Sequence, residues 1–408
     1  MAILSYKVRF LTPGFLGDAK QDGRWRTPPF KALLRQWWRV VWAADHGFSG
    51  SVEAMRYEEG RLFGNAWLKS GEGANAKTCF NKSLVRLRLD RWDEGRETKA
   101  SWGKKELNPA EKILHPERGQ QIGPMLYLGY GPLTTEKTTV PGQSYSVYPT
   151  LLKGNAAIQA GECAELSLAV LEDHPNPELA EVLKTNRPRL QRALWLMDRY
   201  GTVGGRSRNG WGSFVLEPVG ANSKLVGATP LLDWKSALEQ DWPRAVGTDD
   251  KGPLIWQTVG SYEDWKRLMR DLAVVKLGLR TQFVFTPGSK GKLEDRHWLS
   301  YPVTNHKVDA WGDKLRLPNS LRFKVRPAPG DSKKLVGVIF HVPCQPPPRF
   351  GPNEGDLKRV WRRVHELLDE LCRDAKGGGR QYLCIRDAAR RVKLKPMLDS
   401  VQLVRVKE

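Results

Sequence analysis

Residues 201–212 read G-T-V-G-G-R-S-R-N-G-W-G and combine five glycines with two arginines, an asparagine and a tryptophan. Glycine lets the backbone adopt positive φ and approach a ligand closely, and free amide groups in such a loop form an anion-binding nest. The two guanidinium groups would add positive charge beside that nest. These residue types in this spacing predict a site for a nucleic-acid phosphate backbone. The expected contact residues are Gly204, Gly205, Arg206, Ser207, Arg208, Asn209 and Trp211.

Two familiar nucleotide-binding loops do not fit this segment. Gly205 and Gly210 have the G-x-x-x-x-G spacing of a mononucleotide-binding loop, but Trp211 and Gly212 stand where lysine and serine or threonine should follow. A dinucleotide-binding loop lies between a strand and the helix that it opens, whereas here an amphipathic helical stretch comes first. The alternative that stays open is a glycine-rich hairpin whose arginines are merely solvated.

A second basic segment lies in the helix that is predicted to begin near Thr27. Thr27 suits the N-cap and Pro28 the first helical position, and F-K-A-L-L-R-Q-W-W-R-V-V-W continues without a helix breaker. At about 100° per residue, one arc of this helix is apolar and the adjacent arc is basic and aromatic. The apolar arc holds Phe30, Leu33, Leu34, Trp37, Val40 and Val41. The basic-aromatic arc holds Lys31, Arg35, Trp38, Arg39 and Trp42.

Like charges one turn apart on a helix repel each other, and an anionic partner would remove that cost. Indole rings between the charges could stack on unpaired bases. We therefore expect RNA contacts from Lys31, Arg35, Trp38 and Arg39, with Trp37 in the core. The alternative is that Trp38 and Trp42 pack under a neighbouring element while the basic side chains are solvated.

The composition favours a protein that binds polyanions. The 408 residues include 66 lysines and arginines against 45 aspartates and glutamates, which gives a formal net charge of +21. Apolar runs are too short for a transmembrane helix, and the N-terminal residues alternate as in a strand, so we expect a cytoplasmic protein without membrane contact. The five cysteines show no zinc-type spacing, and no cofactor or metal is expected.

Residues suited to acid–base catalysis are sparse. RNA cleavage by side chains needs a general base near the 2′-hydroxyl and an acid near the leaving oxygen. The glycine-rich loop contains no histidine, which leaves His46 and the loop of Asp18 and Asp22 as candidates. The D-A-K-Q-D-G stretch is more often solvated turn chemistry. We predict no catalytic residue, and an endoribonuclease remains the alternative function.

The order of predicted elements indicates an α+β protein with two domains. Strand–helix–strands–helix–strand in the first half fits a ferredoxin-like β-α-β-β-α-β unit, with residues 93–124 as an exposed polar insertion. Strands are expected at 3–11, 83–89, 125–130, 163–171 and 212–217, and helices from 28, at 51–61 and at 177–199. The second half repeats the pattern, with helices near 231–240, 262–280 and 355–374 and strands near 281–286, 320–326 and 334–342. A linker around 219–229 separates domains 1–220 and 221–408.

Several of these motifs together resemble a known family. The run L-T-P-G-F-L-G, then R-T-P-P-F-K-A-L-L-R-Q-W-W-R, then L-F-G-N and finally G-G-R-S-R-N-G-W-G-S-F resembles the RAMP superfamily of CRISPR-associated proteins. Within it, the pattern is most similar to the first-numbered subunit of the type III-B Cmr effector complex. Ala32 replaces the usual glycine and Asn65 the usual serine. Weaker echoes occur in R-H-W-L-S-Y-P at 296–302 and in R-L-P-N-S-L-R-F-K-V at 316–325.

This resemblance implies two ferredoxin-like RAMP domains and a place in an antiviral CRISPR ribonucleoprotein. It implies a subunit near the 3′ region of the guide CRISPR RNA, with the guide–target duplex as a further candidate ligand. The implied partners are guide RNA, target RNA and other RAMP subunits of a Cmr-type complex. The resemblance does not imply catalysis by this subunit.

The motifs supply cations rather than a base-reading code, so binding of single-stranded RNA should depend steeply on salt. If about five to six phosphates are neutralised, a slope near −0.7 per contact predicts an affinity loss on the order of 10²-fold between about 50 and 200 mM salt. A titration of labelled RNA across this salt range measures the slope. An affinity that stays constant would contradict an electrostatic mode of binding.

Overall fold

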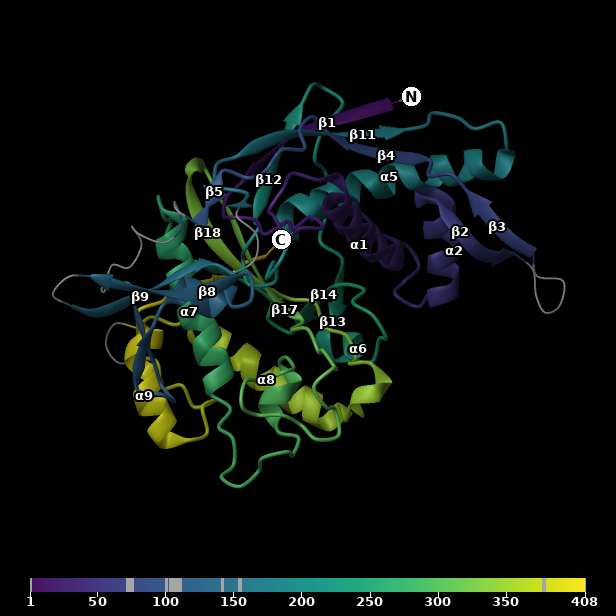
Figure 1. Cartoon of the computed structure of the whole chain (residues 1–408). Coiled ribbons are helices and arrows are strands. Elements are labelled where there is room, and N and C mark those ends of the chain that lie inside the picture. The colour runs from purple at the N-terminus through teal and green to yellow at the C-terminus, as the bar shows by residue number, and fades with distance from the viewer. Residues whose placement is uncertain are drawn as a thin grey trace. The chain divides into compact units, whose positions relative to one another are not determined.

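The computed structural model describes residues 2–70, 77–99, 102, 112–140, 143–152, 156–375 and 379–407, which form two compact units of mixed α+β structure (Figure 1). The first unit comprises Met1–Glu97, Gly154–Gly205 and Gly212–Pro230, and the second Thr98–Lys153, Arg206–Trp211 and Leu231–Glu408. The chain passes from the first unit to the second for the last time between Pro230 and Leu231, ten residues after the predicted boundary at 220. Both units are discontinuous, because 98–153 and the loop residues 206–211 belong to the second.

The first unit contains a four-stranded antiparallel sheet with the order β12-β1-β11-β4. Its main elements follow one another as β1 (Ala2–Phe10), α1 (Thr27–Asp45), α2 (Val52–Phe63), β4 (Val85–Leu89), β11 (Cys163–Val170), α5 (Pro177–Tyr200) and β12 (Phe214–Val219). Shorter strands are β2 (Asn65–Ser70), β3 (Lys77–Asn81), β5 (Glu97–Thr98) and β10 (Ala156–Ala157). The β2–β3 pair forms a separate ribbon. Each of the long elements was predicted from the sequence to within a few residues.

Period-two burial in β1 and helical periodicity in α1 and α5 build the core of this unit. Tyr6, Val8 and Phe10 are at most 1% exposed and alternate with more exposed neighbours. Helices α1 and α5 pack against each other beside the sheet (Figure 1). Asn176 caps α5 by accepting a hydrogen bond from the Leu179 amide at 3.1 Å.

The second unit contains another four-stranded antiparallel sheet, with the order β17-β18-β16-β19. Its elements from the insertion are β6 (Ile113–His115), β7 (Gln120–Ile122), α4 (Pro124–Gly129), β8 (Leu133–Val140) and β9 (Gln143–Leu151). The next are β13 (Leu231–Asp233), α6 (Trp234–Ala237), β14 (Val246–Asp249), β15 (Gly252–Pro253), β16 (Ile255–Thr258), α7 (Trp265–Thr281) and η3 (Asp295–Trp298). The last are β17 (Leu321–Ala328), β18 (Asp331–His341), η4 (Pro348–Phe350), α8 (Glu354–Glu370), α9 (Ala388–Asp399) and β19 (Leu403–Arg405).

Three predicted elements differ in the structure. The strand expected at 125–130 is the helix α4, because Pro124 favours the first turn of a helix. The strand expected at 281–286 is absent, since α7 continues to Thr281. Beyond the helix, the ring of Phe285 stacks on that of His306, with ring centroids 3.6 Å apart. The helix expected at 231–240 is shortened to α6, preceded by the strand β13. Within the predicted insertion at 93–124, the described part holds β5–β7, and residues 100–101 and 103–111 lie outside the described residues.

The C-terminal segment is built into the second unit instead of forming a solvated tail. Helix α9 packs against α7, and β19 pairs with β16 at the edge of the sheet. Arg380 holds this segment in place and is 1% exposed. Its Nε donates to the Arg373 carbonyl at 2.8 Å, and its terminal nitrogens donate to the carbonyls of Leu371 and Val401 at 2.9 and 2.8 Å.

Replacing Arg380 with methionine should strongly destabilise the second unit. The variant keeps much of the side-chain volume but leaves several buried carbonyls without a donor, at about 1–3 kcal/mol each. Arg373→Met is the matched control, because this exposed side chain forms a surface pair with Glu370 at 2.8 Å that is worth less than about 1 kcal/mol. Urea denaturation compares the two free energies of unfolding. Equal values for the two variants would contradict a structural role for Arg380.

Candidate nucleic-acid interface

The predicted apolar arc of helix α1 is buried as expected, but the predicted basic-aromatic arc is not an open surface. All six residues of the predicted apolar arc are buried. Trp38 and Trp42 are also buried, at 0% and 1% exposure, so the prediction that Trp38 faces outward to stack on RNA is wrong. The Trp38 Nε1 donates to Asn186 Oδ1 at 2.8 Å, and its ring meets Phe63 edge-on at 5.9 Å. The physical reason is that α2 and α5 both pack against α1 and cover a wider arc than its apolar stripe.

Glu59 of α2 supplies the negative charge that was expected from RNA beside the α1 arginines. The Glu59 carboxylate, with 5% of its side chain exposed, accepts hydrogen bonds from Arg35 Nε at 3.0 Å and Arg39 Nε at 2.9 Å. Glu58 accepts from the Trp42 Nε1 at 2.7 Å. One carboxylate serves both arginines, so the pair keeps one positive charge. Both side chains also stay more than a third exposed, at 37% and 39%.

Lys31 is the cation of α1 that has the weakest partners. Its Nζ lies 3.5 Å from the Phe63 carbonyl oxygen and 3.5 Å from Ser83 Oγ, and no carboxylate of the described residues forms an ion pair with it. Burial and the neighbouring Arg35 lower the pKa of Lys31. An anion near this amine would relieve both effects, so Lys31 stays a candidate RNA contact.

The glycine-rich loop and the L-T-P-G-F motif form one hydrogen-bonded structure, although they lie almost 200 residues apart. The Leu11 amide donates to the Ser213 carbonyl at 2.8 Å, and the Ser213 amide donates to Thr12 Oγ1 at 3.0 Å. The Gly212 amide donates to the Pro13 carbonyl at 2.8 Å. Their meeting was not predicted, because nothing in the spacing of the two motifs along the sequence indicates it.

Glycine is required in this loop at three positions by backbone conformation. Gly204, Gly210 and Gly212 have φ values of +91°, +91° and +63°. A Cβ at Gly204 would lie 2.6 Å from the Phe15 carbonyl oxygen, and one at Gly212 would collide with the Val203 carbonyl oxygen. The predicted need for glycine is thus confirmed at these three positions. At Gly204 and Gly212, the close approach that glycine permits is to the protein's own backbone and not to a ligand.

The predicted nest of free amides is not found at several positions of the loop, because these amides already donate hydrogen bonds to carbonyl groups. The Gly205 amide donates to the Phe15 carbonyl at 2.9 Å, and the Val203 amide donates to the Gly212 carbonyl at 3.0 Å. The Asn209 and Gly210 amides close turns onto the Arg206 and Ser207 carbonyls at 2.9 and 3.1 Å. These amides hold the loop in shape, so a phosphate at this loop would be bound mainly by side chains.

The polar side chains of the loop contact neutral backbone acceptors in the second unit. Arg206 is exposed, and its Nε donates to the Tyr130 carbonyl at 2.5 Å. Arg208 is half-buried and donates to the Asn319 carbonyl at 2.9 Å, and the Asn209 side-chain amide donates to the Leu128 carbonyl at 2.7 Å. Because carbonyl groups orient both guanidinium groups without neutralising them, their positive charge remains. Their contact with RNA stays a prediction.

Trp211 is a core residue and does not face solvent. It is 0% exposed and packs between Trp102 and Trp265, with ring centroids 5.7 and 5.8 Å away. The expectation that its indole contacts RNA is therefore wrong, because tertiary packing buries the apolar side chain within the second unit. Ser207 is half-buried, and its RNA contact remains a prediction.

The candidate catalytic residues sit in ordinary structural surroundings. Asp18 Oδ1 accepts hydrogen bonds from the Lys20 and Asp22 amides at 2.8 and 3.1 Å, which is turn chemistry. Although desolvation opposes ionisation, these two amides and Arg24 lower the pKa of Asp18. His46 Nδ1 lies 2.7 Å from the Trp42 carbonyl, and its ring stacks on that indole. In the part of the chain that the structure describes, no group of three or more potential ligands could hold a metal ion.

A buried histidine pair in the second unit was not predicted. His365 Nε2 lies 2.9 Å from His341 Nδ1, whose Nε2 lies 2.9 Å from Ser320 Oγ. Burial lowers the pKa of His365 to about 3 and that of His341 well below its usual value. Both rings are stacked with tryptophans. These neutral, enclosed histidines are core residues out of reach of a polymeric substrate, and their scattered sequence positions carry no signal.

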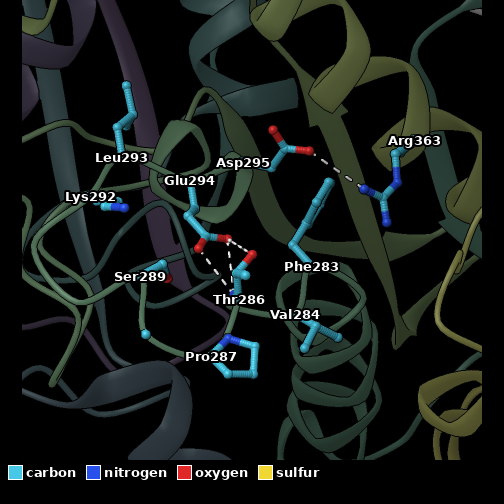
Figure 2. Close-up of a pocket in the computed structure, with 11 residues that line it drawn as sticks. Phe283, Val284, Thr286, Pro287, Ser289, Lys292, Leu293, Glu294, Asp295 and Arg363 are labelled. Carbon is cyan, nitrogen blue, oxygen red and sulfur yellow. Dashed lines mark hydrogen bonds and ion pairs between the residues drawn. The ribbon is translucent and has the colours of Figure 1, made fainter.

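A cleft of about 550 Å³ lies in the second unit between Phe283 and Leu293 (Figure 2). Glu294 accepts hydrogen bonds from the Thr286 amide at 3.0 Å, and Asp295 pairs with Arg363 at 3.6 Å (Figure 2). The two carboxylates offset the cations of the cleft, Lys292 and Arg363. The cleft is therefore a poor match for a polyanion.

Comparison with known proteins gives structural likeness alone. No protein-family model and no curated protein matches the chain. The structure matches apo Cmr1 from Pyrococcus furiosus at 16% identity and a TM-score of 0.37, covering 87% of this chain and 93% of that one. It also matches a chain of the type III-B Cmr-beta complex bound to cognate target RNA, at 12% identity and a TM-score of 0.42, covering 83% and 94%. A chain of a second Cmr-beta structure, with target RNA and AMPPnP in the presence of ssDNA, matches at 11% identity and a TM-score of 0.42. This match covers 90% of the present chain and 99% of the other.

These identities and TM-scores are too low to carry a residue's role from one protein to another. Among the described residues, no helix combines the length and the apolar character needed to cross a membrane.

Trp38 offers a direct test of the two roles considered for α1. Trp38→Ala should cost about 3–5 kcal/mol of folding free energy as a buried large-to-small change. Trp38→Phe keeps a stacking ring but loses the bond to Asn186, at about 1 kcal/mol. Denaturation and RNA titration of both variants separate stability from binding. RNA affinity that falls in Trp38→Ala under conditions where the protein stays folded would contradict the packing role.

Proposed function

We propose that this chain is a non-catalytic, RNA-binding RAMP subunit of a type III-B CRISPR effector complex. In this role it holds the 3′ region of the guide RNA, and the guide–target duplex is its second candidate ligand. Its partners are guide and target RNA and the other RAMP subunits of the complex. The proposal rests on the residues of this chain, and the structural neighbours are compatible with it.

The observation that carries the proposal is the meeting of two motifs in one structure. The L-T-P-G-F motif ends β1, the proline-led helix follows it, and the glycine-rich loop enters β12 beside them. Backbone hydrogen bonds from Gly205 to Phe15 and from Gly212 to Pro13 join the loop to the strand end. A chance resemblance in separate segments would not require the segments to bond to each other.

The strand orders support two ferredoxin-like domains as part of this proposal. In the first unit, β1, α1, β4, β11, α5 and β12 follow the β-α-β-β-α-β order and form the sheet β12-β1-β11-β4. In the second, β16, α7, β17, β18, α8 and β19 follow the same order, and their sheet β17-β18-β16-β19 repeats the arrangement. The proposed domain limits remain 1–220 and 221–408, while residues 98–153 and 206–211 cluster with the second compact unit.

Charge supports RNA as the ligand. The excess of 21 positive charges attracts any polyanion. After the buried tryptophans are removed from the predicted contacts, the cationic candidates are Lys31, Arg35, Arg39, Arg206 and Arg208. Since these residues contact phosphates and do not read bases, the proposed binding is largely independent of sequence.

Incubation with labelled guide RNA, with and without magnesium, tests the absence of catalysis. We expect a stable complex and no shortened RNA under either condition, because Asp18 and His46 are engaged in local hydrogen bonds. His46→Ala and Asp18→Ala are the controls for contaminating nucleases and should bind RNA like the unmodified protein. Cleavage that disappears in either variant would establish the endoribonuclease alternative instead.

Isolation of the native complex tests the partner assignment. A tagged copy of the chain should copurify with RAMP-type subunits and with RNA of uniform guide length. Recovery of the chain alone, free of RNA and other proteins, would contradict a role as an effector subunit.

A further inference from the structure

Four cations gather around helix α7 (labelled in Figure 1) in the second unit, and three of them lie outside the predicted site. They are Arg206 from the glycine-rich loop, Lys276 and Arg280 from α7, and Arg296 from η3, and we refer to them as the α7 cation cluster. Lys276 and Arg280 are four residues apart and therefore lie on the same face of the helix.

A chain of hydrogen bonds connects the loop to this helix. Lys276 Nζ donates to Asn209 Oδ1 at 2.6 Å, and the Asn209 side-chain amide donates to the Leu128 carbonyl at 2.7 Å. Arg206 Nε donates to the Tyr130 carbonyl at 2.5 Å, just after the end of α4. Loop, α4 and α7 thus hold the side chains of Arg206 and Lys276 in defined positions.

Negative charge is scarce in this cluster. Arg296 pairs with Glu117 at 2.7 Å, and this carboxylate is shared with Arg390 at 3.8 Å. Lys276 and Arg206 bond to neutral acceptors. The Nε groups of Arg280 and Arg296 are buried and find no hydrogen-bond partner among the described residues. A buried N–H group without an acceptor destabilises the protein. An anionic ligand that accepts a hydrogen bond from this group would remove the penalty.

Burial and nearby positive charge lower the pKa values of three of the four cations. Desolvation, together with Arg280 and Arg206, lowers the pKa of Lys276 well below its usual value. Desolvation and Arg280 also lower the pKa values of Arg206 and Arg296. Folding without a ligand therefore holds these charges together at a cost. Such an arrangement is typical of a preformed site for an anion.

Other candidate sites have carboxylates beside their cations. The α1 arginines share Glu59, and the cleft of Figure 2 contains Glu294 and Asp295 beside its cations. On α8, Arg359 pairs with Asp295 and Asp356 at 2.6 and 2.7 Å. The α7 cation cluster combines buried, unpartnered donors with an excess of positive charge.

We propose that the α7 cation cluster binds a phosphate group of the RNA backbone, with Arg280 as a principal phosphate-binding residue. This inference rests on the proposed RNA-binding function and adds a defined site to it. Guanidinium groups match phosphate geometry with paired N–H donors, and Arg206 would bring the glycine-rich loop to the same phosphate. RNA contacts would thus extend from the loop onto α7.

Arg280→Gln tests the site, with Arg267→Gln as the matched control. Arg267 is an exposed arginine near the other end of the same helix, about 20 Å away along the axis. With labelled single-stranded RNA at low salt, we expect Arg280→Gln to bind about 10-fold more weakly and Arg267→Gln to bind within about 2-fold of the unmodified protein. Because one repelling charge is removed, the melting temperature of RNA-free Arg280→Gln should be equal or higher.

A second measurement uses inorganic phosphate in place of RNA. Phosphate should raise the melting temperature of the unmodified protein more than chloride at equal ionic strength, and Arg280→Gln should lose most of this rise. Arg280→Lys keeps the charge and should retain an intermediate RNA affinity, which guards against misfolding of the glutamine variant.

The outcomes separate the site from the function. RNA affinity and phosphate stabilisation that are unchanged in Arg280→Gln would overturn the site. Phosphate stabilisation that depends on Arg280, in a protein that does not bind RNA, would overturn both RNA as the ligand and the proposed function while leaving an anion site. A lower melting temperature in Arg280→Gln, with RNA affinity equal to that of Arg267→Gln, would show that Arg280 is a structural residue.

Discussion

Repulsion between cations is the constraint on which the arrangement of this protein depends. With 66 basic and 45 acidic residues, carboxylates cannot serve every cation, so their placement decides which basic clusters are neutralised within the fold. In the first unit, Glu59 neutralises part of the α1 face, and Asp45 accepts from Arg189 and Arg192 at 2.8 and 2.7 Å. Around α7, Glu117 pairs with Arg296 alone among the four cations of the cluster. The distribution of carboxylates thus separates structural charge from charge that is available to a ligand.

The backbone of the glycine-rich loop contributes to this separation of structural charge from available charge. Positive φ at Gly204, Gly210 and Gly212 lets the chain leave α5, turn within a few residues and enter β12, while hydrogen bonds to Pro13 and Phe15 fix both ends. The six residues between these ends belong to the second unit, where carbonyl groups orient their side chains. The glycines therefore act by shaping the loop, and the arginines supply its charge.

Long elements with a clear hydrophobic period were predictable from the sequence, and short ones were not. The alternation in β1 and the helical periods of α1, α5, α7 and α8 placed these elements to within a few residues. The strands β16 and β19 have only four and three residues, too few to show a period, and they form through pairing with partners that are distant along the chain. Helix α4 was mistaken for a strand because six residues suit either structure, and Pro124 carried the stronger signal.

By itself, the sequence determined the α+β character, the charge that favours RNA, the glycine requirement of the loop and the apolar arc of α1. These depend on composition and on local backbone preferences, which neighbouring residues largely decide. Only the tertiary structure decided that Trp38 and Trp211 are buried, that Arg35 and Arg39 share Glu59, and that the loop meets the L-T-P-G-F motif. It also brought Arg206, Lys276, Arg280 and Arg296 together from three separate segments. The reason is physical: a helical period shows which residues share a face, but which elements cover that face depends on how distant segments pack.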